Sequence, residues 1–387
     1  MIPLFEQYPL LGERLAYVPL GEFPTPVQKL ERLGDELGVS QLYIKRDDLS
    51  GKVYGGNKPR KLEFILGNAL RSKATEVMTF GGAGSNHALA TAIYARQVGL
   101  KSISMLMPQP NARYVRRNLL MSHYCGAELH LCGAGLESVR NMPLVYTATT
   151  YQLLRHRLKK GRPPHFISPG GSSPLGVTGF VNAALELGRQ ITSGEMPEPE
   201  YIYVACGTMG TAAGLTLGLR AAKLGGRVVS VAVCSEKFAN TRAMIKLINK
   251  TNSLLRSLDA SFPRFEFSET DVDIRHDYFG KRYALFTDEG MEAVSLMREC
   301  EGIKLDGTYT GKALAALKHD ARSGSLRGKV VLFWNTLNSK DFSDAISDLD
   351  YHDLPRCFHR YFKEAVQPLD RDYCHLIPGT PRQSGPL

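Results

Sequence analysis

The sequence lacks the features that mark membrane-spanning and secreted proteins. Hydrophobic residues make up 43% of the 387 residues, yet no uninterrupted apolar run approaches the roughly 20 residues of a membrane-spanning helix. The first twenty residues contain Glu6 and Glu13 and no basic stretch followed by an apolar block, so we expect no cleaved secretion signal. These absences predict a soluble protein that has no membrane partner.

The sequence also lacks paired cysteines. Its seven cysteines are scattered, odd in number and form no close C-x-x-C pair of the kind that binds zinc or exchanges disulfides. Unpaired cysteines in this pattern are typical of reduced thiols in the cytoplasm. We therefore expect a cytoplasmic protein with no metal site.

No basic segment has the composition of a nucleic-acid interface, although the formal net charge is +10. The densest basic cluster spans residues 155–162, precedes Pro163 and Pro164 and has no interleaved aromatic residues. Cations at the end of a helix face the negative end of its dipole, whereas single-stranded nucleic acid needs aromatic platforms for its bases. The cluster therefore indicates a helix C-terminus, and no nucleic-acid partner is predicted.

What the chain does contain is an alternation of short β-branched runs with helical patterns. Strands are expected at residues 42–46, 76–80, 101–106, 201–205, 228–233 and 330–334, and helices at 61–70, at 88–98 and from the turn 207–211 to 224. Such alternation is typical of an α/β protein with parallel sheets. A chain of this length exceeds one ordinary core, so two domains are expected.

Three short stretches each end an expected strand and open an expected helix, with glycines or hydroxyl groups at the turn. They are residues 55–59, 81–87 and 207–211. A helix start that follows small residues offers free backbone N–H groups to an anion, and the stretch 55–59 adds a lysine. A phosphate, a carboxylate and an amine are what pyridoxal phosphate chemistry on an amino acid requires.

The turn at residues 207–211 has two competing interpretations. The spacing of Gly207, Gly210 and Gly214, with Glu236 after the next strand, also fits a dinucleotide loop and would make NAD the cofactor. However, the motif G-x-G-x-x-G is absent, and hydroxyls at Thr208 and Thr211 suit a terminal phosphate better than a pyrophosphate. A plain strand-to-helix turn that needs glycine for its backbone conformation is the third possibility. The residues assigned to phosphate binding are Gly207, Thr208, Met209, Gly210 and Thr211.

The turn at residues 81–87 is a candidate carboxylate site. Its glycines remove side chains that would block close approach, and Ser85, Asn86 and His87 bring polar groups to a helix start. The alternative is that Ser85 merely caps the helix and that Asn86 is exposed. Capping alone would not explain the glycines.

Lys58 is the candidate nucleophile. It stands one turn before Lys61, and the positive end of the helix together with Arg60 and Lys61 is expected to lower an amine pKa and free a neutral amine. One lysine would attack, and the other would neutralise phosphate. The alternative is that both are ordinary solvated surface groups.

Several separated motifs, taken in order, resemble one enzyme family. They include residues 55–63, 81–87, 169–176, 207–211, 277–283, 288–294 and 309–313, and together they span about residues 20–320. These motifs resemble the family of D-cysteine desulfhydrase and 1-aminocyclopropane-1-carboxylate deaminase, which are pyridoxal-phosphate enzymes of fold type II. The resemblance implies a fold like the tryptophan synthase β subunit, with two open, twisted, mostly parallel sheets flanked by helices.

The resemblance also implies roles for single residues. Lys58 resembles the Schiff-base lysine, and Asn86 resembles the contact to the phenolic oxygen of the cofactor. Ser85, Asn86 and His87 resemble the loop that binds the substrate carboxylate, with Ser85 also near the reacting carbon. The turn 207–211 resembles the phosphate loop, assisted by Lys61. Tyr309 resembles the tyrosine beside the pyridine ring, and Tyr283 resembles a second active-site tyrosine.

Thr310 bears on the type of reaction. The deaminases of the family carry glutamate at this position, where a carboxylate would keep the pyridine nitrogen protonated. A neutral hydroxyl supports only a weaker hydrogen bond and a weaker electron sink, which favours the loss of a good β leaving group. His87 points the same way, because the desulfhydrase-like members resemble this sequence more closely there. Cys206, Lys281, Arg282, Phe286 and Thr287 depart from the family pattern on the expected substrate side.

We therefore predict a pyridoxal-phosphate-dependent lyase or deaminase that converts a small amino acid into a 2-oxo acid and ammonia. The larger domain is expected to comprise residues 1–61 and 166–387, with a partly ordered tail over 366–387. The smaller inserted domain is expected over 62–165, with the cofactor in the cleft between the domains. A homodimer is implied by the resemblance. Ring opening of 1-aminocyclopropane-1-carboxylate, racemisation, a non-catalytic cofactor-binding protein and an NAD-dependent oxidoreductase are the alternatives.

Overall fold

The computed structural model describes residues 2–133 and 142–373, which belong to two compact units. Unit 1 comprises residues 1–73 and 168–339, and unit 2 comprises residues 74–167 and 340–387. This division differs from the expected boundaries at three points, of which the shift of residues 166 and 167 into the smaller unit is the least. Residues 62–73 belong with the larger unit, and residues 340–373 belong with the smaller one. The end of the expected tail, from residue 374 onward, lies outside the described residues.

Unit 1 is built on a six-stranded sheet with the strand order β1-β2-β10-β7-β8-β9. Only β1 runs antiparallel, and the other neighbouring strands pair in parallel. The run Val-Val-Leu-Phe-Trp of β10 is almost entirely buried, as expected for a parallel strand covered on both faces. The strands are β1 Val27–Lys29, β2 Gln41–Lys45, β7 Tyr201–Cys206, β8 Arg227–Ala232, β9 Asp273–Arg275 and β10 Val330–Trp334.

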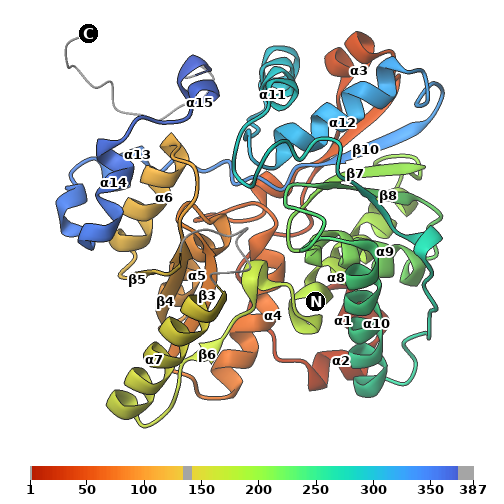
Figure 1. Cartoon of the computed structure of the whole chain (residues 1–387). Helices are drawn as coiled ribbons and strands as arrows, with labels where there is room; N and C mark the ends of the chain where they lie inside the picture. Colours follow the sequence, from red (N-terminus) through yellow and green to blue (C-terminus); the bar gives the residue numbers. More distant parts are fainter. Residues whose placement is uncertain (1, 134–141, 374–387) are drawn as a thin grey trace. The chain divides into compact units, whose positions relative to one another are not determined.

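Helices cover both faces of this sheet. Figure 1 shows α3, α11 and α12 on one side and α8, α9 and α10 on the other. Leu215 and Phe180 belong to the large core cluster that α8 and α9 build against the sheet. The helices of unit 1 are α1 Pro3–Gln7, α2 Pro9–Arg14, α3 Glu31–Leu37, α4 Lys58–Arg71, α8 Pro174–Thr192, α9 Gly210–Ala221, α10 Thr241–Leu258, α11 Asp288–Glu301 and α12 Thr310–Arg322.

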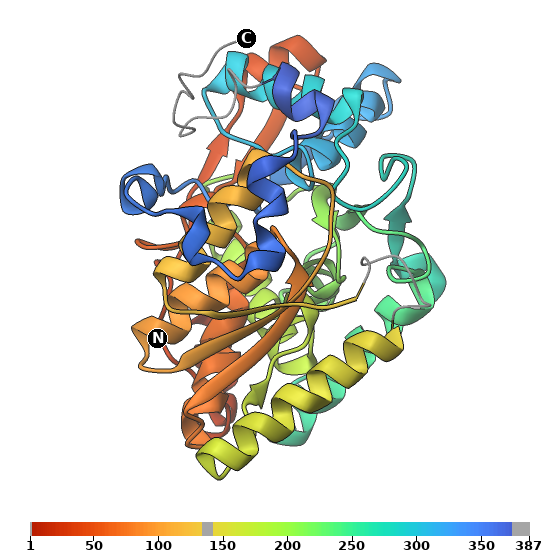
Figure 2. The same ribbon diagram turned by 60° about the vertical axis from the view of Figure 1, so that its left-hand side comes forward.

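Unit 2 contains a four-stranded parallel sheet with the order β5-β4-β3-β6. Its strands are β3 Glu76–Gly82, β4 Lys101–Met107, β5 Glu128–Leu131 and β6 His165–Phe166. Its helices are α5 Asn86–Gln97, α6 Arg113–Tyr124, α7 Met142–Lys160, α13 Ser343–Ile346, α14 Arg360–Lys363 and α15 Pro368–Asp372. The C-terminal helices, blue in Figure 2, lie beside α6, while α7, yellow in the same view, lies across the other face of the sheet.

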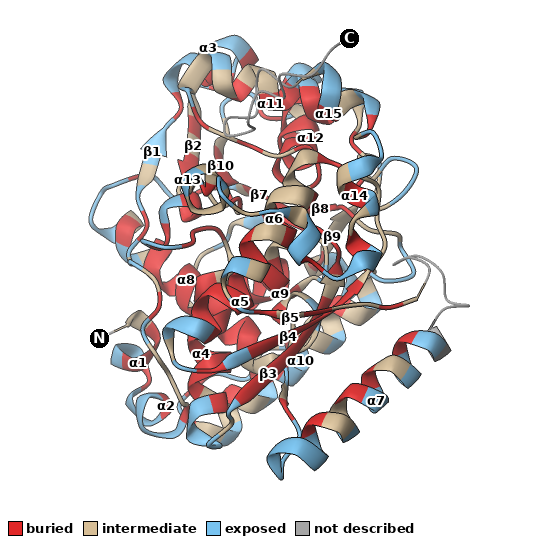
Figure 3. Ribbon diagram, turned by 90° about the vertical axis from the view of Figure 1, so that its left-hand side faces the viewer, coloured by how far each residue is buried: buried red, intermediate tan, exposed pale blue. Residues whose placement is uncertain are grey.

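The packing of unit 2 fixes where the candidate carboxylate turn emerges. Residues 87–95 of α5 are all buried, and Figure 3 shows α5 and β3 mostly as buried structure. Met78, Phe80, Ile103 and Met105 of the sheet pack with Val145 of α7. The turn between β3 and α5 is therefore held by rigid elements at both ends.

The elements expected from the sequence agree with the structure to within a few residues. The strands expected at 76–80, 101–106, 201–205 and 330–334 are β3, β4, β7 and β10. The basic cluster 155–162 lies at the C-terminal end of α7, as expected. Among the described residues, no helix is long and apolar enough to cross a membrane, and no group of three or more acidic, histidine or cysteine side chains is arranged to hold a metal ion.

Candidate active site

Lys58 is the first residue of α4, and the helix starts there because Pro59 occupies its first turn. Lys58 is half-buried, and burial lowers the pKa of its ammonium group to about 8. The preceding Asn57 donates a side-chain hydrogen bond to Thr211 Oγ1 over 3.0 Å. The start of α4 is thereby joined to the turn 207–211.

The lowered pKa of Lys58 was expected from the positive end of the helix and from the neighbouring cations, but its cause in the structure is burial. Arg60 points into a buried ionic cluster instead. Its guanidinium group lies 2.7 Å from Asp47 Oδ1 and 2.9 Å from Glu186 Oε2, and these carboxylates raise the pKa of Arg60 against the effect of burial. Arg60 therefore anchors α4 to α8.

Lys61, one helical turn after Lys58 in α4, lies beside the turn 207–211, where a Cβ atom at Gly210 would be 2.9 Å from its Nζ. Its side chain is 1% exposed, and burial, with the nearby charge of Lys58 as a second cause, lowers its pKa well below the usual value. Its ammonium group donates to Gly170 O over 3.2 Å and to Ser172 Oγ over 3.4 Å. Burial disfavours the charged form of this amine, and an anion bound beside it would stabilise the ammonium form, so the position is suited to an anionic ligand.

The turn 207–211 connects β7 to α9. Met209 adopts the left-handed conformation, with φ of 64°, and α9 begins at the next residue. A non-glycine residue in this conformation carries strain that often accompanies a functional site. Ser172 Oγ lies 2.6 Å from Thr208 Oγ1 and accepts a hydrogen bond from Gly210 N over 3.2 Å.

Two glycines let the polar groups of this region approach the backbone closely. A Cβ atom at Gly210 would overlap Ser172 Oγ and lie 2.9 Å from Lys61 Nζ, and a Cβ atom at Gly170 would overlap the Thr208 side chain. The backbone at both positions therefore approaches polar groups more closely than any other residue would permit. The result is a cradle that places the hydroxyls of Ser172 and Thr208 and the amine of Lys61 at the start of α9, and hydroxyl and amine donors are groups that bind phosphate.

The two predicted active-site tyrosines contact each other, and Tyr309 lies beside the turn 207–211. The hydroxyls of Tyr283 and Tyr309 lie 2.5 Å apart, and a Cβ atom at Gly207 would lie 3.9 Å from the ring of Tyr309. Burial raises the pKa of Tyr283 to about 12, although its hydrogen bond to Tyr309 opposes the rise. The phenol therefore stays protonated and can donate near neutral pH.

Thr310 begins α12 and is fully buried. Its Oγ1 accepts a hydrogen bond from Asp306 N over 2.8 Å, so the hydroxyl hydrogen points elsewhere. The side chain of Asp306 in turn accepts from Thr308 N over 2.8 Å and from Tyr309 N. This compact turn fixes both Tyr309 and Thr310.

In unit 2, the turn 81–87 joins β3 to α5. Ser85 caps α5, because its Oγ accepts from Ala88 N over 3.2 Å. A Cβ atom at Gly81 would overlap the Ser85 side chain, so glycine at this position lets Ser85 fold back. Capping is thus one role of Ser85, and its hydroxyl hydrogen remains able to donate.

The other polar residues of this turn are buried or held in place. His87 is 3% exposed. Asn86 is half-buried, and its Oδ1 accepts from Asn118 Nδ2 over 2.9 Å, so its amide hydrogens point away from Asn118. Asn86 was expected to be exposed if the turn were only a cap, and the structure differs from that expectation.

The structure adds residues to the site that sequence reasoning gave no role. Ser172 completes the cradle in unit 1, while Asn118 and Gln109 hold the turn in unit 2, where Gln109 Oε1 accepts from Gly84 N over 3.0 Å. Ser172 lies in the glycine-rich run 169–176, which was a usable signal. Gln109 and Asn118 lie 25 and 34 residues from Gly84, and no local pattern marks them.

The residues that depart from the family pattern have mixed environments. Cys206 and Phe286 are buried, whereas Lys281 and Arg282 are exposed. Thr287 caps α11, because its Oγ1 accepts from Gly290 N over 3.2 Å.

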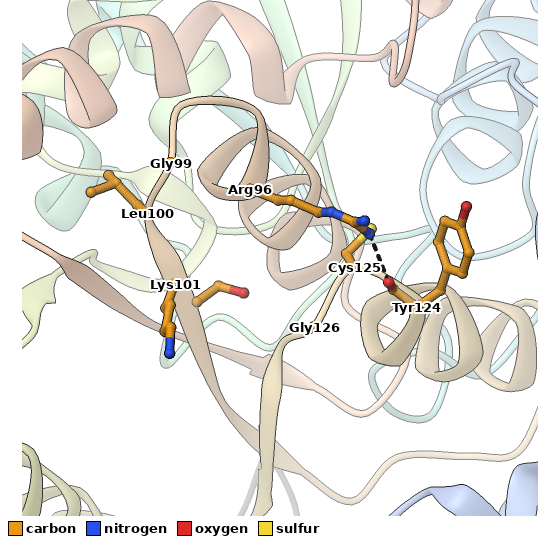
Figure 4. A pocket seen from close by; sticks show the side chains of 8 residues that line it. Arg96, Gly99, Leu100, Lys101, Tyr124, Cys125 and Gly126 are labelled. Atoms are coloured by element: carbon orange, nitrogen blue, oxygen red, sulfur yellow. Dashed lines mark hydrogen bonds between the residues drawn. The ribbon is translucent and has the colours of Figure 1, made fainter.

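A hollow of about 300 Å³ lies elsewhere in unit 2, lined by Arg96, Gly99, Leu100, Lys101, Ser102, Tyr124, Cys125 and Gly126. Figure 4 shows Arg96 reaching across it to donate to Tyr124 O over 2.8 Å. Lys101 begins β4, so the hollow lies at the amino end of the strands, whereas Gly82 pairs with the last residue of β4. Ligands of parallel sheets bind at the carboxyl ends, which favours the turn 81–87 over this hollow.

Comparison with known proteins defines the class. The family model described as "Pyridoxal-phosphate dependent enzyme" matches residues 18–336. The chain therefore belongs to this family, which implies pyridoxal phosphate as the cofactor.

Two relatives with more than 30% identity place the chain in a smaller family among the pyridoxal-phosphate-dependent enzymes. The chain is 34% identical over 298 residues to D-cysteine desulfhydrase of Salmonella paratyphi B, an alignment that covers 76% of this chain and 85% of that protein. A solved ACC deaminase homologue has a TM-score of 0.72 and 32% identity, covering 89% of this chain and 98% of the other. The chain therefore belongs to the D-cysteine desulfhydrase and ACC deaminase family.

A more distant structure supports the fold alone. A fungal L-serine ammonia-lyase from Rhizomucor miehei has a TM-score of 0.55 and 18% identity, with 91% of this chain and 99% of that chain covered. The α/β fold with two open, mostly parallel sheets is thus the fold of these enzymes.

Proposed function

We propose that the protein catalyses β-elimination from a small amino acid, with D-cysteine as the first substrate to test. The products would be a 2-oxo acid and ammonia, together with sulfide when the substrate is cysteine. The observation that carries the proposal is the juxtaposition in unit 1 of a buried amine, Lys61, and the cradle of Ser172 and Gly210. Lys58, with its pKa near 8, stands one helical turn away.

The residues of unit 1 fit pyridoxal phosphate. The cradle offers the phosphate the hydroxyls of Ser172 and Thr208 and the amine of Lys61, while Gly210 N–H holds the Ser172 hydroxyl in place. Thr310 keeps a hydroxyl hydrogen for a pyridine nitrogen, because its Oγ1 already accepts from Asp306 N. When bound, pyridoxal phosphate supplies an electron sink for the carbanion that forms at the α-carbon.

The protein's own residues would then handle the protons. Lys58 would hold the cofactor at its carbonyl carbon and would take up the α-proton of the substrate at Nζ, which a pKa of about 8 favours. The Tyr283 phenol, kept protonated by burial, would donate a hydrogen bond or a proton near the leaving group. Tyr309 would orient Tyr283 through the hydrogen bond that joins the two hydroxyls.

In unit 2, the turn 81–87 would bind the substrate carboxylate. The backbone N–H groups at the start of α5 and the Ser85 hydroxyl are the donors, and His87 lies beside them. The Asn86 amide hydrogens would donate to the phenolic oxygen of the cofactor, since Asn118 already occupies Asn86 Oδ1.

The neutral Thr310 separates the proposed reaction from its nearest alternative. A hydroxyl does not hold a proton on the pyridine nitrogen as a carboxylate would, so elimination of a good leaving group is favoured over ring opening of 1-aminocyclopropane-1-carboxylate. Release of 2-oxobutyrate from that cyclopropane substrate would favour the deaminase alternative.

The test is reconstitution followed by a substrate panel. Protein purified with pyridoxal phosphate should be yellow and should release 2-oxo acid from D-cysteine, and Lys58→Ala should lose activity by about 1,000-fold or more. Lys101→Ala, which removes an exposed lysine, is the matched control. A colourless protein that takes up no pyridoxal phosphate would contradict the proposal and reopen the NAD alternative.

Two further outcomes separate the remaining alternatives. Bound cofactor without 2-oxo acid release from any D- or L-amino acid would favour a non-catalytic protein. Interconversion of enantiomers without ammonia release would favour a racemase. The homodimer and the cytoplasmic location stay predictions that the resemblance and the cysteine pattern support, and light scattering coupled to gel filtration tests the former.

A further inference from the structure

The C-terminal segment, defined here as residues 351–373, is a folded part of unit 2. It lies beyond residue 336, where the match to the family model ends. Phe358, Tyr361 and Asp370 in this segment are at most 1% exposed. Side chains this deeply buried indicate a specific contact surface, and that surface is the loop 108–112 together with α6.

Tyr361 and its neighbours hold the loop that contains Gln109 and Asn111. Gln109 N donates to the Tyr361 hydroxyl over 3.1 Å, and Asn111 Nδ2 donates to Tyr361 O over 2.9 Å. Gln367 N donates to Asn111 O over 2.9 Å. Both ends of the loop are therefore bonded to the C-terminal segment.

Asp370 supplies the cap that α6 does not provide for itself. Ala112 occupies the N-cap position of α6 and has no side chain able to accept a hydrogen bond. Asp370 Oδ2 accepts from Arg113 N, the first N–H of the helix, over 2.7 Å. A carboxylate at a helix N-terminus satisfies a free donor and interacts favourably with the helix dipole. Arg116 adds a bond from Nε to Tyr361 O over 2.7 Å.

The same loop and helix hold the turn 81–87. Gln109 Oε1 accepts from Gly84 N over 3.0 Å. Asn118, from α6, donates to both Gly84 O and Asn86 Oδ1 over 2.9 Å. A Cβ atom at Gly84 would lie 2.7 Å from the ring of Tyr114 and 2.8 Å from Val115, so the contact is close as well as polar.

We infer that the C-terminal segment is a clasp that positions the turn 81–87 through Gln109 and α6. The assignment of carboxylate binding to that turn rests on the proposed function. Hydrogen-bond donors serve a bound ligand only when they are held within a few tenths of an ångström, and a turn of glycines has little rigidity of its own. Tyr361, Asp370, Gln109 and Asn118 are thus positioning residues, which need not touch the substrate.

Hydrogen exchange in the protein without cofactor tests the clasp directly. Tyr361→Phe removes the acceptor of Gln109 N and should accelerate exchange of the amides in residues 81–87 by about tenfold or more, as expected for a weakened local opening equilibrium. Tyr351→Phe is the matched control, because it removes a hydroxyl from the same segment while its ring stacks on Phe362 and it takes no part in the bonds described above. Gln109→Ala removes the acceptor of Gly84 N directly, so its acceleration of exchange at residues 81–87 gives the largest effect to compare with.

Acceleration in Gln109→Ala but not in Tyr361→Phe would overturn the inference, because the segment would then fail to transmit order to the turn. Acceleration at 81–87 in Tyr361→Phe that is absent in Tyr351→Phe would support it. Should Tyr361→Phe fold poorly, Asp370→Asn provides a second variant with the same expected pattern but a smaller acceleration, since the amide oxygen accepts a weaker hydrogen bond from Arg113 N and carries no charge.

Kinetics of the reconstituted enzyme distinguish this inference from the proposed function. Tyr361→Phe should raise KM for the amino acid by about fivefold to tenfold with kcat within twofold, and the control should change neither. If the wild-type protein is inactive but the variants change hydrogen exchange at residues 81–87 as expected, the proposed reaction is contradicted and the clasp is supported. If the wild-type protein is active but the variants keep its hydrogen-exchange rates at residues 81–87 and its KM for the amino acid, only the clasp is contradicted.

Discussion

The two glycine turns, 207–211 in unit 1 and 81–87 in unit 2, share one local architecture but differ in what surrounds them. Each follows a buried parallel strand and opens a helix. The first lies beside the buried amine of Lys61, which becomes a cation when an anion binds beside it and which donates to the neutral oxygens of Gly170 and Ser172. The second is held by neutral amides, Gln109 and Asn118.

This difference separates two kinds of anion. A phosphate carries more charge and more acceptor oxygens than a carboxylate, and it gains more from a cation in a partly buried site. The turn with the buried lysine is suited to the permanent phosphate of a cofactor. The neutral turn is suited to a carboxylate that must bind and leave in every cycle.

The largest expected effect concerns Lys58, beside the charged turn. A pKa of about 8 in place of 10.5 leaves about 300-fold more neutral amine at pH 7. The rate at which an amine-directed reagent labels Lys58 in the cofactor-free protein should therefore rise up to about pH 8 and then level off, because only the deprotonated amine reacts. Peptide mass spectrometry separates Lys58 from Lys61, with the exposed Lys101 as reference. A rate that still rises through pH 10 would show an ordinary lysine.

The next effect tests whether the charged turn is specific for phosphate. Lys61→Met removes the charge with little change in length, and a charged hydrogen bond contributes about 1.5 to 3 kcal/mol. Affinity for pyridoxal phosphate should fall by about 10- to 100-fold, while the affinity for pyridoxal, which has no phosphate, stays the same. Fluorescence titration of the cofactor-free protein measures both constants. Equal losses for the two ligands would remove the distinction between the turns.

The smallest effect belongs to the neutral turn. Ser85→Ala should raise KM for the amino acid by about tenfold, leave the affinity for pyridoxal phosphate unchanged, and cost about 1 kcal/mol of unfolding free energy through the lost helix cap. Asn240→Ala is the matched control, because Asn240 caps α10 in the same way. It should lose similar stability at constant KM. A KM change of the same size in both variants would assign the effect of Ser85 to stability alone.

Much of the fold follows from the local pattern. The buried runs of β3, β7 and β10 and the glycine turns after β3 and β7 are readable because a parallel strand is apolar throughout and its end must change direction. The cause of the lowered pKa of Lys58 could not be predicted from the sequence. Arg60 stands two residues away in sequence, yet Asp47 and Glu186 draw its charge into a separate buried cluster.

The assignment of the C-terminal residues to a unit could not be predicted from the local pattern either. Weak periodicity after residue 334 pointed to an irregular tail of the larger domain, whereas residues 340–373 belong with unit 2. Short helices such as α14 and α15 carry little signal, since their stability comes from burial of a few side chains such as Tyr361.

The sequence by itself determined the α/β class, the order of the strands and turns along the chain, and the residue types able to bind a phosphate, a carboxylate and a carbonyl carbon. These features are local, because they depend on spacing and backbone conformation. Only the tertiary structure decided that Ser172 completes the phosphate cradle, that burial lowers the pKa of Lys58, and that Gln109 and Asn118 hold the carboxylate turn. Burial and long-range hydrogen bonds arise when distant segments pack together, and no local spacing encodes them.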